Sequence, residues 1–310
     1  MNLKTSKVLI TGGSGFIGSN FTTKLLERGA EVHVLDNLFA GKRSLIPNDA
    51  EFHEGDLRNE EIKTIVPEIN PDVIIHLAAI HYIPYCNENP EEAFDVNVIG
   101  TRNLLEATRQ VENVQKAVFA SSAAVYPPRS QANTEESPLG PIDIYGKTKL
   151  LGEDLMELYN EKTRVPTASA RLFNVYGPNE TNAHLIPAIV KQIQEGNRTI
   201  ELGNLSPKRD FVHVSDVSEA IISLAKEFDG DHRAYNVGTC NEHSVEEVVQ
   251  KTSVALGEEI KIEQDAERVR ESDRPHLQAD ISRIQNEIGW SPSISFTEGL
   301  RELLDEEVMA

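Results

Sequence analysis

The chain has 310 residues, of which 39% are hydrophobic, and a formal net charge of −20 at pH 7. This length suits a full α/β domain with a smaller second region. The negative charge disfavours nucleic-acid binding, because such binding needs a broad basic surface that releases counterions. Every apolar run is far shorter than the roughly 18 residues of a membrane span, and no signal peptide precedes the first strand. We therefore expect neither a nucleic-acid nor a membrane partner.

Cys86 and Cys240 lie in unrelated contexts and show neither a metal-binding spacing nor a disulfide framework, which suits a reducing, cytoplasmic location. Five histidines also lack metal-ligand spacing: His33, His53, His81, His213 and His243. We interpret them as structural or surface residues, with His81 as a candidate for a pocket wall. No metal site is expected.

The first predicted strand, Lys7 to Thr11, leads through glycines into a predicted helix that starts at Phe16. Gly12, Gly15 and Gly18 form the pattern G-x-x-G-x-x-G. Unpaired N–H groups at a helix start and residues without side chains suit the close approach of a pyrophosphate. Glycines also mark ordinary strand-to-helix turns, so this pattern needs support from the residues that follow.

That support comes from a second predicted strand, Glu31 to Asp36. It ends in an acid about 20 residues past the glycines, where a carboxylate accepts hydrogen bonds from an adenosine ribose. The same carboxylate repels a 2′-phosphate, which favours NAD over NADP. A third strand is predicted over 51–56, and Asp56 and Leu57 at its end are placed beside the adenine. An alternative is that Asp56 caps a helix that follows from Arg58.

The fourth predicted strand, 71–79, has the near-continuous apolar run of a strand covered on both faces, and its small residues Ala78 and Ala79 leave room at the carboxyl end. A helix is predicted over 91–109, a fifth strand over 114–122 and a sixth over 165–172. Strands and helices thus alternate through the first half. This order predicts an α/β fold with a doubly wound parallel sheet.

Tyr145 and Lys149 begin a predicted helix that continues to Tyr159, and a spacing of four places them side by side on one face. A tyrosine is a poor base at neutral pH because its pKa is about 10. An ammonium about 4 Å away, at an effective dielectric of 20, stabilises the tyrosinate by roughly 4 kcal/mol, which lowers its pKa by about three units. Lys149, together with a positive nicotinamide ring, would therefore bring the pKa of Tyr145 to about 7. The alternative is that Tyr145 and Lys149 form an ordinary solvated pair on the surface of the helix.

Beyond residue 175 the alternation loosens. Helices are predicted over 184–195, 215–228 and 244–256, and strands over 199–202 and 234–237. We divide the chain into a Rossmann-like NAD-binding domain, 1–175, and a smaller α/β substrate-binding region, 176–310, from which some segments return to the first domain.

With these residues in place, the chain resembles the nucleotide-sugar epimerases and dehydratases of the extended short-chain dehydrogenase/reductase superfamily. The resemblance covers essentially the whole chain. Its motifs are 12–18, 76–79, 97–101, 121–122, 145–149, 171–178, 209–213 and 235–238. Several independent motifs in the same order make a chance agreement improbable.

The resemblance implies a role for each matching position. Ser122, Tyr145 and Lys149 match the catalytic triad of the family. The implied cofactor-binding residues are Gly12, Gly15, Phe16, Ile17, Gly18, Asp36, Asn37, Asp56, Leu57, Leu77, Ala78, Ala79, Asn97, Tyr145 and Lys149. The implied substrate-binding residues are Ser122, Tyr145, Asn174, His184, Leu185, Arg209, Arg270 and Leu277. Asn174, Arg209 and Arg270 match residues that hold the sugar-nucleotide diphosphate, although surface ion pairing is an alternative for both arginines.

The reaction implied by the resemblance is an NAD-dependent 4-epimerisation of a UDP-hexose, in which C4 is oxidised to a ketone and reduced again on the opposite face. Dehydratases of this family carry Asp-Glu directly after the catalytic hydroxyl, whereas this chain has Ala123 and Ala124. The related decarboxylases keep a glutamate in that loop, which is also missing here. Elimination and decarboxylation are therefore disfavoured.

Other activities remain open at this point. They are a nucleotide-sugar ketoreductase or dehydrogenase, an epimerase of UDP-uronic acids or UDP-2-acetamido sugars, and a non-enzymatic dinucleotide sensor. The complete Ser-Tyr-Lys set disfavours the sensor. The resemblance also implies a homodimer formed through the helices near 97–109 and 145–159, whose apolar residues equally fit packing on the sheet.

Overall fold

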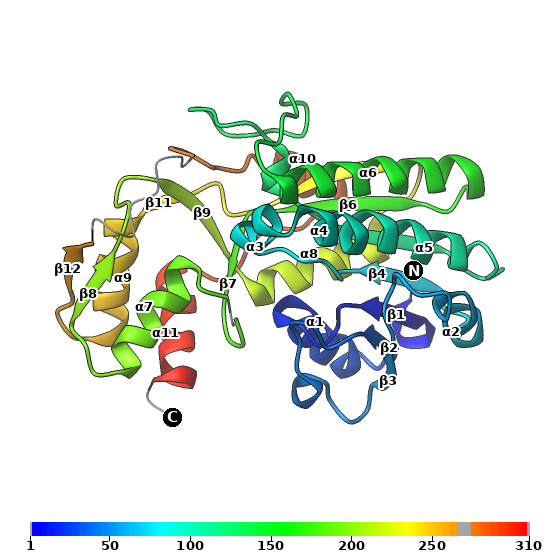
Figure 1. Ribbon diagram of the computed structural model, residues 1–310, viewed down its shortest axis with the longest axis horizontal. Helices are drawn as coiled ribbons and strands as arrows, with labels where there is room; N and C mark the ends of the chain where they lie inside the picture. The colour runs from blue at the N-terminus through cyan, green and yellow to red at the C-terminus, as the bar shows by residue number, and fades with distance from the viewer. Residues whose placement is uncertain (1, 181, 266–273, 309–310) are drawn as a thin grey trace.

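A seven-stranded sheet forms the framework of the structure (Figure 1). The computed structural model describes residues 2–180, 182–265 and 274–308. The strand order is β3-β2-β1-β4-β5-β6-β10, and every pairing is parallel. The strands are β1 (Lys7–Thr11), β2 (Glu31–Asp36), β3 (Glu51–Glu54), β4 (Val73–His76), β5 (Lys116–Ser122), β6 (Thr167–Leu172) and β10 (Arg233–Val237). This topology confirms the predicted doubly wound α/β fold.

Helices cover both faces of the sheet (Figure 1). On one face lie α2 (Ile62–Ile69), α5 (Gly100–Thr108) and α6 (Ile144–Thr163). The other face is covered by α1 (Phe16–Glu27) and α8 (Val214–Glu227). Two-sided burial explains why the strands are apolar almost throughout rather than alternating.

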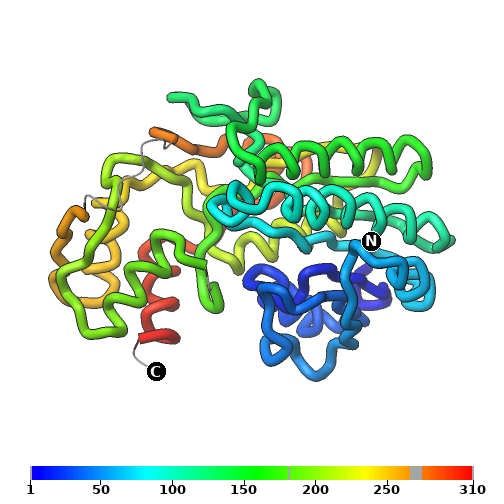
Figure 2. Tube along the Cα trace, in the orientation of Figure 1, coloured from blue at the N-terminus to red at the C-terminus, as the bar shows by residue number. Residues whose placement is uncertain are grey.

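A smaller lobe lies at the left of Figure 1 and has its own apolar core. It contains the three-stranded sheet β11-β9-β7 and the strand pair β12-β8. These strands are β7 (Asn174–Tyr176), β8 (Thr199–Leu202), β9 (Lys208–His213), β11 (Glu242–Ser244) and β12 (Lys261–Gln264). The helices are α7 (Leu185–Gln194), α9 (Val245–Leu256) and α11 (Phe296–Glu307). Figure 2 shows the N-terminus on the sheet lobe and the C-terminal helix on this lobe.

Three elements that follow residue 175 pack on the large sheet. They are α8, β10 and α10 (Ser282–Ile288). β10 extends the sheet next to β6, and α10 contacts β10. The chain therefore crosses between the lobes more than once, in the manner expected for the returning segments. The boundary at residue 175 stays a prediction.

Several predicted elements have different limits in the structure. The third strand ends at Glu54 and the fourth spans only Val73–His76. The helix expected from Arg58 begins at Ile62, because Asp56 accepts the backbone N–H of Arg58 and turns the chain instead. The helix expected over 91–109 is divided into α4 (Pro90–Phe94), a π-helical turn η3 (Asp95–Ile99) and α5. None of the helices in the described ranges has the length and apolar character needed to cross a membrane.

Candidate active site

A cavity of about 1210 Å³ opens at the carboxyl edge of the large sheet, where the smaller lobe meets it. Its wall combines the segments that follow β1, β2, β4 and β5 with residues of β7, β9 and α7. This is the edge at which open parallel sheets bind ligands. The volume exceeds the range of about 300–1,000 Å³ for drug-sized ligands, so the cavity has room for a dinucleotide and a second ligand.

The glycine turn forms one end of this cavity. Gly12 has φ +74°, and a Cβ there would lie 2.6 Å from the Ala78 nitrogen; a Cβ on Gly18 would collide with the Gly12 carbonyl oxygen. Gly15 differs, because its Cβ would meet only the Gly12 oxygen at an ordinary 3.4 Å. Gly12 and Gly18 are thus required by packing within the protein. Gly15 keeps free the space in front of the turn.

Helix α1 starts at this free space. Gly15 is its N-cap and supplies no side-chain hydrogen bond, and Phe16, Ile17 and Gly18 follow as the first helical residues lining the cavity. The first-turn N–H groups of a helix have no partner within the helix and carry the positive end of its dipole. The turn therefore fits the pyrophosphate of a dinucleotide.

Asp36 lies at the end of β2, beside the glycine turn. Its Oδ2 accepts the N–H of Ser14 at 3.0 Å and its Oδ1 accepts the N–H of Leu38 at 2.8 Å. A carboxylate has about four lone-pair sites, so each oxygen can still accept from a ribose hydroxyl. Asp36 thus holds the turn in place while it lines the cavity.

Asp56 borders the same end of the cavity, with Asn37 and Leu57. The hydrogen bonds from Arg58, and a further one from Asn37, outweigh desolvation and lower the pKa of Asp56 to about 2. The N-cap of α2 is Glu61, so Asp56 does not cap that helix as the alternative proposed. An ionised Asp56 therefore faces the cavity.

Leu77, Ala78 and Ala79 continue from β4 along the cavity floor, as expected. Asn97 is outside the cavity lining and 2% exposed. Its Oδ1 accepts the N–H of Ile80 at 2.8 Å, and its Nδ2 donates to the Ile80 carbonyl at 2.9 Å. The π-helical turn that carries Asn97 thus secures the loop after β4, so Asn97 shapes the floor from beneath.

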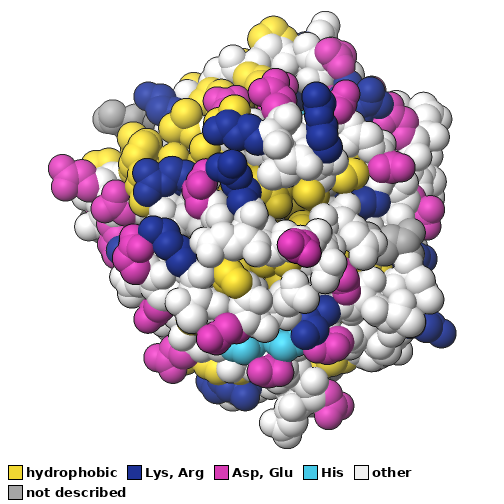
Figure 3. Space-filling model, turned by 90° about the vertical axis from the view of Figure 1, so that its right-hand side faces the viewer, with side chains coloured by type: hydrophobic (Ala, Val, Ile, Leu, Met, Phe, Trp, Pro, Cys, Tyr) yellow, Lys and Arg dark blue, Asp and Glu magenta, His cyan; other side chains and the backbone are white. Residues whose placement is uncertain are grey.

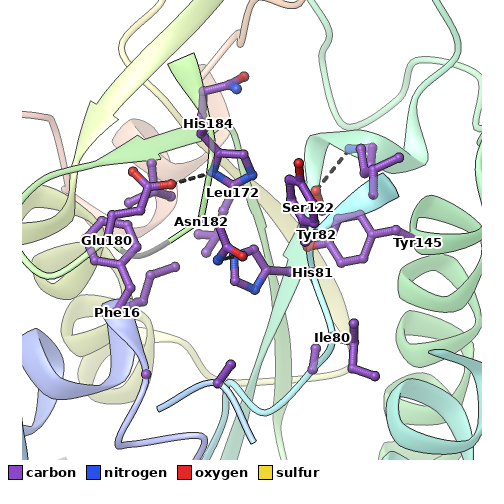
Figure 4. Close-up of a pocket in the computed structure, with 18 of the residues that line it drawn as sticks. Phe16, Ile80, His81, Tyr82, Ser122, Tyr145, Leu172, Glu180, Asn182 and His184 are labelled. Atoms are coloured by element: carbon purple, nitrogen blue, oxygen red, sulfur yellow. Dashed lines mark hydrogen bonds and ion pairs between the residues drawn. The ribbon is translucent and has the colours of Figure 1, made fainter. Parts of the chain in front are cut away.

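Ser122, Tyr145 and Lys149 all line this cavity, and Figure 4 shows the Tyr145 ring pointing toward Ser122. Ser122 ends β5, and its side chain lies near enough to the Tyr145 hydroxyl to lower the pKa of Tyr145. Tyr145 lies in the first turn of α6, where the N-cap Asp143 accepts the N–H of Gly146 at 2.7 Å. Lys149 follows one turn later. The helical spacing therefore does bring the tyrosine and the lysine to one site.

Lys149 is held firmly at the back of this group. Its ammonium donates to the Ala120 carbonyl at 2.8 Å and lies 4.7 Å from the Phe119 ring centroid and 5.8 Å from that of Tyr145. Burial lowers the pKa of Lys149 from 10.5 to about 7, against the opposing effect of Cys86 and Glu153. The amine is therefore only partly protonated at neutral pH.

The expected lowering of the Tyr145 pKa is not met by the protein alone. Burial raises the pKa of Tyr145 above its usual 10, and the hydrogen bond from Ser122 lowers it only in part. The sequence argument counted the attraction of the ammonium but not the desolvation that burial imposes on phenolate and ammonium alike. Among the described residues, the nearby Lys149 does not offset this burial, so activation of Tyr145 needs a further positive charge.

The expected substrate residues come from several segments. Asn174 begins β7, Arg209 is on β9, His184 caps α7 and Leu185 is its first residue; all line the cavity. Leu277 lines it too, because its N–H donates to Lys208 and its carbonyl accepts from Asp210 along β9. Arg270 lies outside the described residues.

Arg274 is a cavity residue that the sequence analysis missed. It is 8% exposed, and its Nη2 donates to the Ala124 carbonyl at 3.2 Å and to Asp143 at 3.1 Å. It thereby joins the segment that contains Leu277 to the loop after Ser122. Its only sequence signal was an arginine close before Leu277, which does not reveal a contact about 150 positions away along the chain.

A second group of polar cavity residues contains Glu180 and Asn182, which the sequence analysis missed, beside His81 and His184, which it named (Figure 4). The buried Glu180 carboxylate contacts His184, and Asn182 Nδ2 lies 3.0 Å from His81 Nε2. Burial lowers the pKa of His81 to about 4 and raises the pKa of Glu180. His81 therefore forms part of the wall, as the sequence suggested, and does so as a neutral imidazole. The short spacing from Glu180 to His184 gave only a weak helical signal.

A sequence model of the family described as GDP-mannose 4,6 dehydratase matches residues 9–303. The chain belongs to this family. It lies in the extended short-chain dehydrogenase/reductase superfamily, as the motifs predicted.

Relatives and solved structures are similar to this protein along nearly its whole chain. A putative UDP-glucose 4-epimerase of Methanocaldococcus jannaschii is 33% identical and covers 96% of this chain and 97% of its own. The UDP-glucose 4-epimerase of Thermotoga maritima, solved with UDP-glucose, superposes with a TM-score of 0.90 at 28% identity over 96% of this chain and 97% of its own. The UDP-glucose 4-epimerase of Thermus thermophilus, solved with NAD, has a TM-score of 0.87 at 33% identity and covers 96% of this chain and 98% of its own.

Proposed function

We propose that this protein is an NAD-dependent 4-epimerase of UDP-hexoses that interconverts UDP-glucose and UDP-galactose. The observation that carries the proposal is the convergence of Ser122, Tyr145 and Lys149 between the glycine turn and the residues of β7 and β9. The similarity of the entire chain to proteins named UDP-glucose 4-epimerase supports the same activity.

The cofactor end of the cavity suits NAD. The helix start at Gly15 and Phe16 receives the pyrophosphate, and the Asp36 carboxylate accepts hydrogen bonds from the ribose and disfavours a 2′-phosphate. When bound there, NAD would supply the hydride acceptor for oxidation of the sugar carbinol and the hydride donor for the return step. Its positive ring also supplies the charge that Tyr145 needs to act as a base.

The proton of the sugar hydroxyl goes to Tyr145. The Ser122 hydroxyl lies near that of Tyr145 and would align the substrate hydroxyl with it. Lys149, bonded to the Ala120 carbonyl, lies behind this pair, and when its amine is protonated its positive charge stabilises the Tyr145 phenolate. The same three residues return the proton when the ketone is reduced.

Epimerisation also requires that the sugar turn while its nucleotide stays bound. Asn174 and Arg209 are placed to hold the diphosphate from the smaller lobe, across the cavity from Ser122. A guanidinium is well suited to this, because it gives charge-assisted, directional hydrogen bonds to phosphate. The sugar then presents either face to the same catalytic residues.

The residues of the loop after Ser122 favour a 4-epimerase over a dehydratase. Ala123 and Ala124 lie in the 3-10 turn η4 (Ala123–Val125), where family dehydratases carry an acid and a base for removing water. Neither alanine can move a proton. This favours a reaction that only oxidises and reduces the carbinol.

The test is to incubate the purified protein with UDP-glucose, UDP-galactose and their 2-acetamido counterparts, with proton NMR and NADH absorbance as readouts. Interconversion of C4 epimers without net NADH supports the proposal and identifies the sugar. Steady NADH accumulation indicates a dehydrogenase or, in reverse, a ketoreductase. No reaction on any of the four sugars contradicts the hexose proposal and leads next to UDP-uronic acids.

A homodimer and a cytoplasmic location remain part of this proposal. Phe94 on α4 and Leu151 and Leu158 on α6 are large apolar residues with exposures of 41%, 39% and 42%. An interface through these helices would cover them. Light scattering of the wild type and of Leu158→Glu tests this: a dimer that becomes a monomer on substitution supports the interface, and a monomeric wild type contradicts it.

A further inference from the structure

Two histidines and a glutamate meet at the outer edge of the large sheet, away from the active-site cavity. Among the described residues, His33, Glu51 and His53 form a group of three ligand-bearing side chains whose ligand atoms all lie within 4.8 Å of one another. β2 and β3 bring them together, because His33 is paired with Glu51 and His53 with Leu35. The linear sequence showed no metal spacing because the three are joined only by this strand pairing.

The pleat directs all three side chains to one face. His33 and Leu35 are two residues apart on β2, as are Glu51 and His53 on β3, so each pair shares a face. Leu35 belongs to the core beneath α2, whereas Glu51 is solvent-exposed. The group therefore lies where the covered part of the sheet meets solvent. In Figure 3, two histidine side chains lie next to each other at the surface among acidic ones.

The spacing of the ligand atoms suits a tetrahedral ion. His33 Nδ1 lies 3.0 Å from His53 Nε2, and the two Glu51 carboxylate oxygens lie 3.6 Å from His33 Nδ1 and 3.7 Å from His53 Nε2. Ligands bound to zinc at about 2.0–2.1 Å in tetrahedral geometry are about 3.3 Å apart. The observed separations bracket that value, so small side-chain movements suffice.

The second ring nitrogen of His33 strengthens the argument. His33 Nε2 lies 3.1 Å from Glu31 Oε1, and Glu31 in turn pairs with Lys7 at 3.2 Å. A carboxylate that accepts the Nε2 proton makes Nδ1 the unprotonated nitrogen of His33. In the structure this nitrogen accepts a hydrogen bond from His53 Nε2 at 3.0 Å, and a bound ion would take the place of that His53 proton. Metal-bound histidines almost always have such an outer carboxylate. His33 is 4% exposed, so its ring is held in this orientation by its surroundings.

We propose that His33, His53 and Glu51 form a binding site for one divalent transition-metal ion, with Zn²⁺ as the probe ion and Glu31 orienting His33. Imidazole with one carboxylate suits Zn²⁺, Ni²⁺ or Cu²⁺ rather than Mg²⁺ or Ca²⁺. The ion clamps the edge strand β3 to β2, and the exposed side of the site leaves a position for water. It takes no part in the reaction proposed above.

The experiment uses tag-free full-length protein, stripped with a chelator and titrated with ZnCl₂ by calorimetry. We expect saturable binding of one ion per chain and a higher melting temperature with Zn²⁺ than with the chelator. In His53→Ala, binding falls at least tenfold and the thermal shift disappears. Glu31→Gln keeps the hydrogen bond but loses the charge, and weakens binding by about 10–100-fold.

The matched control is His276→Ala, which removes a histidine paired with Glu242 at 2.8 Å elsewhere on the surface. It should bind Zn²⁺ like the wild type. Circular dichroism of each variant in chelator verifies folding, and His53→Gln replaces His53→Ala if the latter does not fold. Absence of saturable binding, or equal binding by wild type and the His53 variant, would overturn the proposal.

Discussion

At the cofactor end of the cavity, residues that are close in the chain are close in the site, whereas the substrate end is assembled from distant segments. The turn from β1 to α1 brings Gly12, Gly15 and Gly18 to one place within seven positions. At the other end, Asn174, Arg209 and Leu277 meet only because β7 pairs with β9 and the segment 275–277 runs along β9.

This difference shows how each end is stabilised. The cofactor end depends on local backbone geometry, such as the positive φ of Gly12 and the start of α1. The substrate end depends on pairings between distant strands and on Arg274, which bonds the loop after Ser122. Tyr145, Ser122 and Lys149 lie between the two ends. Substitutions should therefore affect cofactor binding, chemistry and substrate binding separately.

The largest effect is expected at Tyr145. Tyr145→Phe removes the hydroxyl that takes the substrate proton, so kcat should fall by about 10²–10⁴-fold while the affinities for NAD and UDP stay near those of the wild type. Tyr159→Phe, on the same helix but outside the cavity lining, is the control and should keep its kcat. A Tyr145→Phe enzyme within a few-fold of wild-type kcat would contradict the assigned role.

Lys149 gives the next largest effect, on stability. Burial lowers the pKa of Lys149 in the folded chain to about 7, from the 10.5 of a solvated lysine. Between these pH values the unfolded chain binds a proton that the folded chain lacks. The free energy of unfolding therefore rises with pH by up to about 1.4 kcal/mol per pH unit. Below pH 7 Lys149 is protonated in both states, and the folded chain bears the whole penalty of burying its charge.

Lys149→Met should therefore be more stable than the wild type by about 2–5 kcal/mol near pH 7, and inactive. The difference should shrink toward pH 10. Denaturant unfolding of both proteins without cofactor measures it, and other titrating groups cancel in the comparison. If the free energies of unfolding of the two proteins change with pH in the same way, burial of Lys149 does not destabilise the folded chain as proposed.

Arg209→Leu probes the substrate end. Loss of charge-assisted hydrogen bonds, worth about 1.5–3 kcal/mol, should raise KM for the UDP-sugar by about 10–100-fold with little change in NAD affinity. Lys208→Leu replaces the neighbouring cation on the same strand, outside the cavity lining, and should leave KM unchanged. An equal loss of NAD affinity in Arg209→Leu would show that the two ends are not independent.

Gly15→Ala gives the smallest effect and probes the cofactor end. Its Cβ meets the protein only at an ordinary contact distance, so folding should be retained while the NAD dissociation constant rises about tenfold. Gly18→Ala is the comparison, because its Cβ collides with the Gly12 carbonyl and should lower the melting temperature instead. Equal losses of melting temperature in the two variants would contradict the interpretation that the space in front of Gly15 is open for the cofactor.

Local patterns predicted the sheet lobe well. Sequence patterns located all seven strands of the large sheet. The inner strands are apolar because both of their faces are buried, whereas the edge strand β3 is only half-buried and carries two glutamates. The spacing of four between Tyr145 and Lys149 predicted their proximity, since a helix has a fixed period. Element limits were less accurate where a side chain redirects the backbone, as Asp56 does before α2.

Amino-acid order alone thus determined the α/β class, the glycine turn, the acid at Asp36 and the Tyr145–Lys149 pair, because each depends on interactions between near neighbours or on a regular period. The family resemblance added Ser122 to that pair. Only the tertiary structure decided that Arg274 reaches Ala124, that Asn97 lies beneath the cavity, and that His33, Glu51 and His53 meet. It also showed that burial raises the pKa of Tyr145, an effect that the sequence argument had not counted. Contacts between distant strands, and the desolvation that comes with burial, are properties of the packed chain and leave no periodic trace in the sequence.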